Sequence, residues 1–390
     1  MRTDSVSATP SESAVDLRTI LDDLRTLVLA ESPSSDLAAV ARSARTVAEL
    51  IGARLGRHPE IVGVDGVDHV LLRAANPEVL ILAHHDTVWP LGTIEQIPYS
   101  EAGGVVRGPG CFDMKLGLVQ AVNSLAELRR RHGEGIVDRV SLLVTGDEEV
   151  GSSTSRTLLE EEAKRCRAVL VLEAAGPGGA LKVERKGVSR YRLEVTGRAA
   201  HAGLDPETGV NAAIAAAEMI LAVAELRDVA AGTTVTPTVV TAGTAPNTVP
   251  AQALVDVDVR AATVAEQHRV DQSIRRIGPS DPHATLVIHG GPNRPPMERA
   301  MTEELAGLTR RLAGELGQAP PTTMSVGGAS DGNFTAALGI RTLDGLGAVG
   351  GGAHAPDEHA QIAAILPRTQ LLTALLGELL RGSPGPAGVG

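Results

Sequence analysis

The chain has 390 residues, of which 43% are hydrophobic and 21% charged, which is typical of a globular protein with room for two domains. Its net charge of −11 argues against nucleic acid or an anionic membrane as a partner. Two cysteines, Cys111 and Cys166, are too few for a disulfide framework.

The two ends of the chain carry little pattern. Residues 1–15 contain acids and hydroxyls but no continuous apolar run, so we expect no signal peptide. No stretch reaches the roughly 18 to 20 apolar residues that a membrane span needs, and we expect a cytoplasmic protein. Segments 1–13 and 383–390, rich in small residues or in Gly and Pro, are expected to be flexible.

Helix and strand patterns alternate through the first half of the chain. Apolar residues at helical spacing predict a helix over 16–30, and Asp36 could cap a second helix that runs to about Leu55. This alternation predicts a parallel sheet covered by helices. The further predicted elements are a strand at 79–83, a helix at about 116–131, a strand at 140–145, a helix near 152–165 and a strand at 168–172.

The pattern changes at about residue 185. Predicted strands at 191–195, 233–241, 254–259 and 284–289 are interleaved with helices at 208–226 and 263–276. This β-α-β-β-α-β order is typical of a separate α+β domain with an antiparallel sheet. The first pattern resumes from 298 to 381. We therefore predict an α/β fold: a mostly parallel-sheet catalytic domain covered by helices (14–184 and 292–382), interrupted by an inserted α+β domain (185–291).

The predicted strand at 140–145 is followed by three consecutive carboxylates, Asp147, Glu148 and Glu149. A divalent cation would remove their mutual repulsion, because carboxylate oxygens are good ligands for such ions. The alternative is a solvated acidic turn. Adjacent residues on a regular strand point to opposite faces. At a strand end, however, a turn could let one glutamate bind metal while the other reaches a metal-bound water as a general base.

Four further segments place metal-binding groups at the ends of predicted strands or loops. His84 and Asp86 follow one strand and face the same side, so Asp86 could support the second nitrogen of His84. Asp113 follows a Gly/Pro loop, Glu173 ends a buried strand, and His354 follows a run of glycines. Each alone could be a helix cap, a solvated acid or a structural histidine. Together, at one expected edge of a parallel sheet, they favour zinc or a similar divalent ion.

These segments resemble the dinuclear zinc peptidase/deacylase family. The family includes glutamate carboxypeptidase, aminoacylase, acetylornithine deacetylase and succinyl-diaminopimelate desuccinylase, and the overall likeness is greatest to bacterial glutamate carboxypeptidase. It extends from about residue 16 to 381. The resemblance rests on five segments in this order. They are His-His-Asp-Thr-Val after the strand at 79–83, Gly-Pro-Gly-Cys-Phe-Asp-Met-Lys from 108, Thr-Gly-Asp-Glu-Glu-Val-Gly-Ser from 145, Glu173 and the His354 segment.

The resemblance implies two divalent metal ions, zinc first, with cobalt or manganese as alternatives. Asp113 would bridge the two ions. One ion would take His84 and Glu173, and the other Glu149 and His354.

The resemblance also implies roles for the residues around the metals. Glu148 would be the general base and Asp86 the partner of His84. The inserted segment would be a lid and dimerisation domain of a homodimer. The resemblance assigns no role to Asp147, and we expect this residue to support the local structure.

Four residues match positions that contact substrate in the family. His201 would reach across the dimer to stabilise an oxyanion. Asn247 and Arg260 would contact substrate, and the planar fork of Arg294 would bind a substrate carboxylate. A locally hydrogen-bonded histidine and surface arginines are the alternatives. The role of the Gly-rich loop 327–333 stays open.

The resulting hypothesis is a dinuclear metallopeptidase or amidohydrolase that cleaves an amide or peptide bond next to a free carboxylate. Its substrate would be a small N-acyl amino acid or short peptide. A carboxypeptidase releasing a C-terminal residue, such as an acidic one, competes with an N-acyl-amino-acid deacylase or desuccinylase. A one-metal aminopeptidase and a catalytically silent binding or scaffold protein are further alternatives.

Overall fold

The computed structural model describes residues 15–381, so the predicted flexible ends 1–13 and 383–390 lie outside the described residues. A large domain is built on a six-stranded sheet in the order β1-β2-β6-β3-β7-β14. β3 pairs in parallel with β6 and β7, and β7 with β14, while β1 and β2 form an antiparallel edge. The strands are β1 (Glu60–Val64), β2 (Val67–Leu72), β3 (Val79–His84), β6 (Val140–Thr145), β7 (Ala168–Val171) and β14 (Arg341–Leu343).

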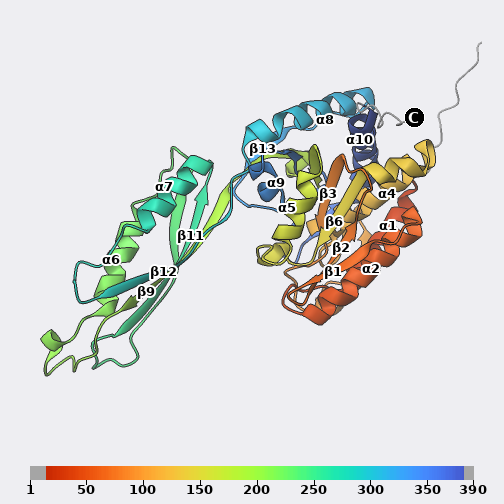
Figure 1. The fold of residues 1–390 in the computed structure, drawn as a ribbon. Helices are drawn as coiled ribbons and strands as arrows, with labels where there is room; N and C mark the ends of the chain where they lie inside the picture. Colours follow the sequence, from red (N-terminus) through yellow and green to blue (C-terminus); the bar gives the residue numbers. More distant parts are fainter. Residues whose placement is uncertain (1–14, 382–390) are drawn as a thin grey trace, which may run out of the picture.

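Helices cover both faces of this sheet (Figure 1). Successive side chains of a strand point to opposite faces. Accordingly, Val79 and Ile81 pack into the larger hydrophobic core with α1, α2, α4 and α10, and Leu80 and Leu82 pack into a smaller core with α5 and α9. The helices of this domain are α1 (Leu17–Leu29), α2 (Leu37–Leu55), α3 (Thr93–Gln96), α4 (Leu116–His132), α5 (Arg156–Lys164), α8 (Glu303–Glu315), α9 (Gly332–Ala337) and α10 (Ile362–Arg381).

α10 is, among the described helices, the one long and apolar enough to cross a membrane by length and composition alone. Half of that stretch is buried inside the protein. Leu371, Leu372, Leu375 and Leu376 belong to the larger core. The packing of this helix therefore accounts for its apolar residues.

The inserted domain, residues 187–294, carries its own antiparallel sheet in the order β10-β11-β9-β12. Helices α6 and α7 cover one face and leave the other open (Figure 1). Leu193, Val195 and Val257 belong to a hydrophobic core separate from that of the large domain. The elements are β9 (Gly187–Thr196), α6 (Ala212–Ala224), β10 (Thr234–Ala242), β11 (Gln252–Ala261), α7 (Val264–Ile274) and β12 (Thr285–Arg294).

The predicted α/β class with an inserted α+β domain is confirmed, but the strand pair β1–β2 was not predicted. Asp65 and Gly66 join these strands with positive φ angles of 48° and 85°. Asp-Gly is a strong hairpin signal and could have revealed the pair. Short strands complete the large domain: β4 (Ser100–Ala102), β5 (Val105–Arg107), β8 (Leu181–Arg185), β13 (Thr323–Val326), β15 (Gly350–Gly351) and β16 (His359–Gln361).

Candidate metal centre

The five side chains predicted as metal ligands lie together at the carboxyl ends of neighbouring parallel strands. His84 is the last residue of β3, and its Nε2 lies 3.5 Å from Asp113 Oδ1 and 3.7 Å from Glu173 Oε1. His354 Nε2 lies 3.1 Å from Glu149 Oε1 and 3.4 Å from Asp113 Oδ2. Asp113 thus lies between two groups of potential metal ligands, His84 with Glu173 and His354 with Glu149.

Asp86 joins the end of β3 to the turn after β6. Its two carboxylate oxygens accept the backbone N–H groups of Glu148 and Glu149, each at 3.2 Å, and one also accepts the Ser34 hydroxyl at 2.7 Å. His84 Nδ1 lies 3.0 Å from the Asp86 carbonyl oxygen and 3.4 Å from its carboxylate. Asp86 therefore contacts His84 mainly through its backbone, while its carboxylate orders the acidic turn.

The three acids of this turn have different surroundings. Asp147 Oδ2 accepts the backbone N–H and the hydroxyl of Thr154, both at 2.8 Å, so it supports the local backbone. Glu148 is buried, whereas Glu149 is partly exposed and faces His354. A short 3-10 turn, Glu148–Val150, lets the adjacent glutamates serve different partners.

The donor set fits a pair of divalent cations. His84 Nε2 and Asp113 Oδ1 are buried and make no hydrogen bond within the described residues. Burying a polar atom without a partner costs about 1–3 kcal/mol of folding free energy, and a bound cation would remove this cost. Ligand atoms of His84, Asp113 and Glu149 lie within 4.8 Å of one another, as do those of His84, Glu148 and Glu173. Imidazole nitrogens with carboxylate oxygens and no thiolate suit zinc, cobalt or manganese.

Proton affinities at the site reflect this crowding of acids. Burial raises the pKa of Glu148 well above its usual range, although Arg294 opposes the shift. Burial and the charge of Asp113 raise the pKa of Glu173 to about 7. Hydrogen bonds to Asp113 and Glu149 raise the pKa of His354 to about 10. The cluster thus takes up protons unless a cation neutralises it, so cations and protons compete for these groups.

Comparison with known proteins identifies the family. The sequence profile of peptidase family M20/M25/M40 matches residues 80–378. The chain belongs to this family. It is 29% identical to carboxypeptidase G2 of Pseudomonas sp. (strain RS-16) over 313 residues, which cover 78% of this chain and 74% of the relative. It is also 29% identical to a succinyl-diaminopimelate desuccinylase of Leptothrix cholodnii over 335 residues, or 77% and 82% of the two chains.

Solved structures share the fold. A metallo-carboxypeptidase of the M20 family from Sulfolobus solfataricus has a TM-score of 0.71 at 17% identity, covering 94% of this chain and 99% of that one. A dinuclear metal-binding M20 peptidase from Bacillus subtilis has a TM-score of 0.63 at 16% identity, with coverage of 94% and 99%. The predicted family resemblance is confirmed, and the protein is a hydrolase of the M20 metallopeptidase class.

In this M20 peptidase, Arg294 lies beside the predicted general base rather than in open solvent. It is buried, and its Nη2 lies 3.0 Å from Glu148 Oε1, 2.6 Å from Ser152 Oγ and 3.2 Å from Asp331 Oδ1. Ser152 also donates a hydrogen bond to Asp331. Asp331 thus gives the Gly-rich loop 327–333 a contact with the site. All of these contacts of Arg294 are made by Nη2, and the role of this residue in binding a substrate carboxylate stays a prediction.

The other predicted substrate residues lie on the inserted domain. His201 and Asn247 share its far end, where the Ala202 N–H donates to the Asn247 carbonyl at 2.9 Å. β9 separates this end from the connection to the large domain, a length of roughly 30 Å for ten residues. Arg260 lies near the connection and pairs with Asp258 at 2.8 Å. One chain alone therefore does not bring His201 to the predicted metal ligands.

Arg185, the last residue of β8, is a site residue that the sequence did not reveal. It is buried, with Nη2 3.4 Å from Glu173 Oε2 and Nε 2.7 Å from Asp344 Oδ2. It places a fixed positive charge behind a predicted metal ligand. The segment Leu181–Arg185 has only the alternating pattern of a short strand, and no local motif indicates a function for Arg185.

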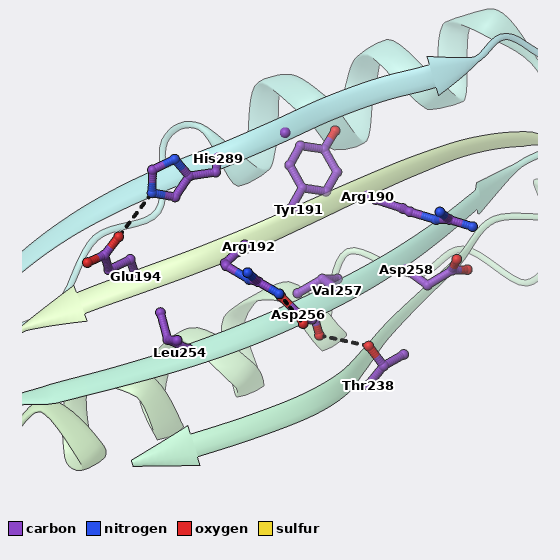
Figure 2. A pocket seen from close by; sticks show the side chains of 11 residues that line it. Arg190, Tyr191, Arg192, Glu194, Thr238, Leu254, Asp256, Val257, Asp258 and His289 are labelled. Atoms are coloured by element: carbon purple, nitrogen blue, oxygen red, sulfur yellow. Dashed lines mark hydrogen bonds and ion pairs between the residues drawn. The ribbon is translucent and has the colours of Figure 1, made fainter. Parts of the chain in front are cut away.

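A cavity of about 780 Å³ lies away from the metal ligands, on the open face of the inserted sheet (Figure 2). Most charges that line it are paired with one another. Arg192 contacts Asp256 at 2.7 Å, and His289 contacts Glu194 at 3.1 Å. The cavity therefore lacks the convergence of donors found at the metal ligands.

Proposed function

We propose that this M20 peptidase is a carboxypeptidase that uses two zinc ions to cleave an amide bond next to a free carboxylate. The released residue would be a C-terminal amino acid, with acidic residues as first candidates. The observation that supports this most is the convergence of His84 and His354 on the two oxygens of Asp113, with Glu149 and Glu173 completing the two groups. The name of the relative carboxypeptidase G2 supports the same reaction class.

Glu148 is the proposed general base. When bound, the two ions would polarise the scissile carbonyl and lower the pKa of a water molecule. Glu148 would take a proton from that water and pass it to the leaving amine. Its burial and raised pKa suit a group that must hold the proton between these two steps. Asp86 would keep Glu148 and Glu149 in place through their backbone N–H groups.

A deacylase or desuccinylase is the second candidate, favoured by the relative named succinyl-diaminopimelate desuccinylase. Both reactions leave a carboxylate beside the cleaved bond, so both could use Arg294. A one-metal aminopeptidase is less well supported, because two histidines approach Asp113 on different oxygens. A silent scaffold is disfavoured because all five ligand positions and the base are present.

Matched substrates test the proposal. We expect hydrolysis of N-acyl dipeptides and N-acyl amino acids with a free α-carboxylate after chelator-treated protein is reloaded with zinc. Loss of a charged hydrogen-bond partner costs about 1.5–3 kcal/mol, so the corresponding α-methyl esters should react about 10–100-fold more slowly in kcat/KM. N-succinyl amino acids distinguish the desuccinylase. Hydrolysis that requires a free amino terminus and tolerates the ester would refute both candidates in favour of an aminopeptidase.

We further propose that the protein is a homodimer through its inserted domain and that His201 acts on the neighbouring subunit. The remote position of His201 and the exposed Ile214 and Leu221 on α6 support this proposal. Purified His201→Ala and Glu148→Gln variants should each be nearly inactive. Refolded together, they should recover activity, because a mixed dimer holds one site with both residues intact. No recovery in mixtures shown to contain mixed dimers would refute action across the interface.

A further inference from the structure

Glu358 has a buried carboxylate that accepts hydrogen bonds from two other parts of the chain. It follows His354 by four residues, in the loop that leads into β16. Oε2 accepts the indole N–H of Trp89 at 2.7 Å and the backbone N–H of Gly110 at 3.0 Å, and Oε1 accepts the backbone N–H groups of Phe112 at 2.9 Å and Asp113 at 3.1 Å.

Each of these donors belongs to a segment with a predicted metal ligand. Trp89 lies five residues after His84, in the loop that follows β3. The other three donors are the backbone N–H of Asp113 and those of Gly110 and Phe112, which shortly precede it. Glu358 is thus the point at which the His84, Asp113 and His354 segments meet. These segments are far apart in the sequence, so their relative placement depends on tertiary contacts such as this one.

The loop that carries Glu358 is closely packed. Gly352 has φ +74°, and a Cβ added there would lie 2.8 Å from the backbone nitrogen of Glu358. The Glu358 N–H donates to the Ala355 carbonyl at 2.9 Å, and Arg107 donates to the Asp357 carbonyl at 3.0 Å. The position of the Glu358 carboxylate is therefore fixed by the backbone as well as by its four donors.

The chemistry of the four donors requires an ionised carboxylate. Both oxygens of a carboxylate accept and neither donates, so each can take two N–H groups. A glutamine at this position would turn an NH2 group toward two N–H donors and leave them without an acceptor. An aspartate would keep the acceptor chemistry but would be shorter by one methylene group.

We infer that Glu358 is a positioning residue that fixes the Asp113 and His354 segments relative to His84 and so sets the affinity for the metal pair. This inference rests on the proposed use of two metal ions. Outer partners that orient metal ligands typically change metal affinity by 10–100-fold when they are removed. A carboxylate that served the fold alone would change global stability without this effect.

Glu358→Gln is the principal test variant, and Glu31→Gln is its matched control. The Glu31 carboxylate also accepts two backbone N–H groups in the region after β3, from Gly92 at 2.9 Å and Ile94 at 3.0 Å, but these carry no predicted ligand. In a competition titration with a chromogenic chelator, Glu358→Gln should bind zinc about 10–100-fold more weakly than the unaltered protein. Glu31→Gln should bind zinc with unaltered affinity.

Two readouts need no metal. Hydrogen exchange of the amides of Gly110, Phe112 and Asp113 should become at least tenfold faster in metal-free Glu358→Gln, and unchanged in the control. Trp89 is the one tryptophan of the chain, so its emission should shift to longer wavelength when its indole loses the Glu358 partner.

The outcomes separate the inference from the proposed function. If the unaltered protein binds no divalent ion, the proposed function fails, while the exchange measurement still tests the positioning role. Unchanged zinc affinity in folded Glu358→Gln would overturn the inference. If that variant does not fold, Glu358→Asp replaces it. The shorter acid should then weaken zinc binding and speed exchange of the same amides, and unaltered values of both would overturn the inference.

Discussion

Glu148→Gln is expected to lower turnover by about 10²–10⁴-fold, the range that a general base contributes, while two metal ions per chain remain bound. The amide keeps the shape of the side chain, and its oxygen can still accept a hydrogen bond from Arg294, which lies 3.0 Å from Glu148 Oε1. It cannot take a proton from water. Steady-state kinetics on an N-acyl amino acid and metal analysis of the same preparation measure the two effects.

Glu160→Gln is the control for this prediction. Glu160 lies on α5, a short distance along the chain, and its carboxylate pairs with Arg156 at 2.7 Å without contacting the ligand cluster. Its substitution should leave turnover unchanged. Near-normal turnover of Glu148→Gln with full metal content would refute the assignment of Glu148 as the base.

Asp113→Asn is expected to abolish turnover by a different route, through loss of the metals. The Asp113 carboxylate has one oxygen 3.5 Å from His84 Nε2 and the other 3.4 Å from His354 Nε2, the arrangement required of a ligand shared by two ions. An amide is neutral and offers one oxygen instead of two. Zinc affinity should therefore fall by more than the roughly 10–100-fold expected for an outer partner.

Calorimetric titration of the chelator-treated variant with zinc measures this loss, and circular dichroism checks that the fold is retained. Asp22→Asn is the control, because Asp22 is an exposed acid paired with Arg18 on α1. A folded Asp113→Asn protein that still bound two zinc ions tightly would contradict the bridging role. Full activity restored by excess zinc would place the effect on affinity alone.

The amino-acid sequence was sufficient to predict the class of fold, and the side chains that its motifs indicated as metal ligands lie close together. Buried strands of a parallel sheet read as apolar runs, and their carboxyl ends meet at one edge. His84, Glu149 and Glu173 each follow such a run, so their approach in space could be expected from the order of elements. The residue types then pointed to a divalent cation, since imidazole nitrogens and carboxylate oxygens are ligands for such ions.

Other features of the site depend on contacts between segments far apart in the chain, which no local pattern encodes. The spacing predicted that Asp86 supports His84, and its carboxylate does lie 3.4 Å from His84 Nδ1. The sequence did not reveal that the same carboxylate also accepts the backbone N–H of Glu148, 62 residues away. Arg294 was predicted to bind a substrate carboxylate, and the sequence did not reveal that its guanidinium also contacts Glu148 and Asp331.

Arg185 and Glu358 show the same limit more strongly. Arg185 lies in no sequence motif, and Glu358 lies in the His354 segment without being predicted as a site residue. Only the structure shows that Arg185 approaches Glu173 and that Glu358 accepts the backbone N–H of Asp113. Glu358 and Asp113 are 245 residues apart in the sequence. Residue type and periodicity thus determined which groups could bind metal. Tertiary packing alone decided which buried charges and hydrogen bonds hold those groups in place, because only folding brings such distant partners within bonding distance.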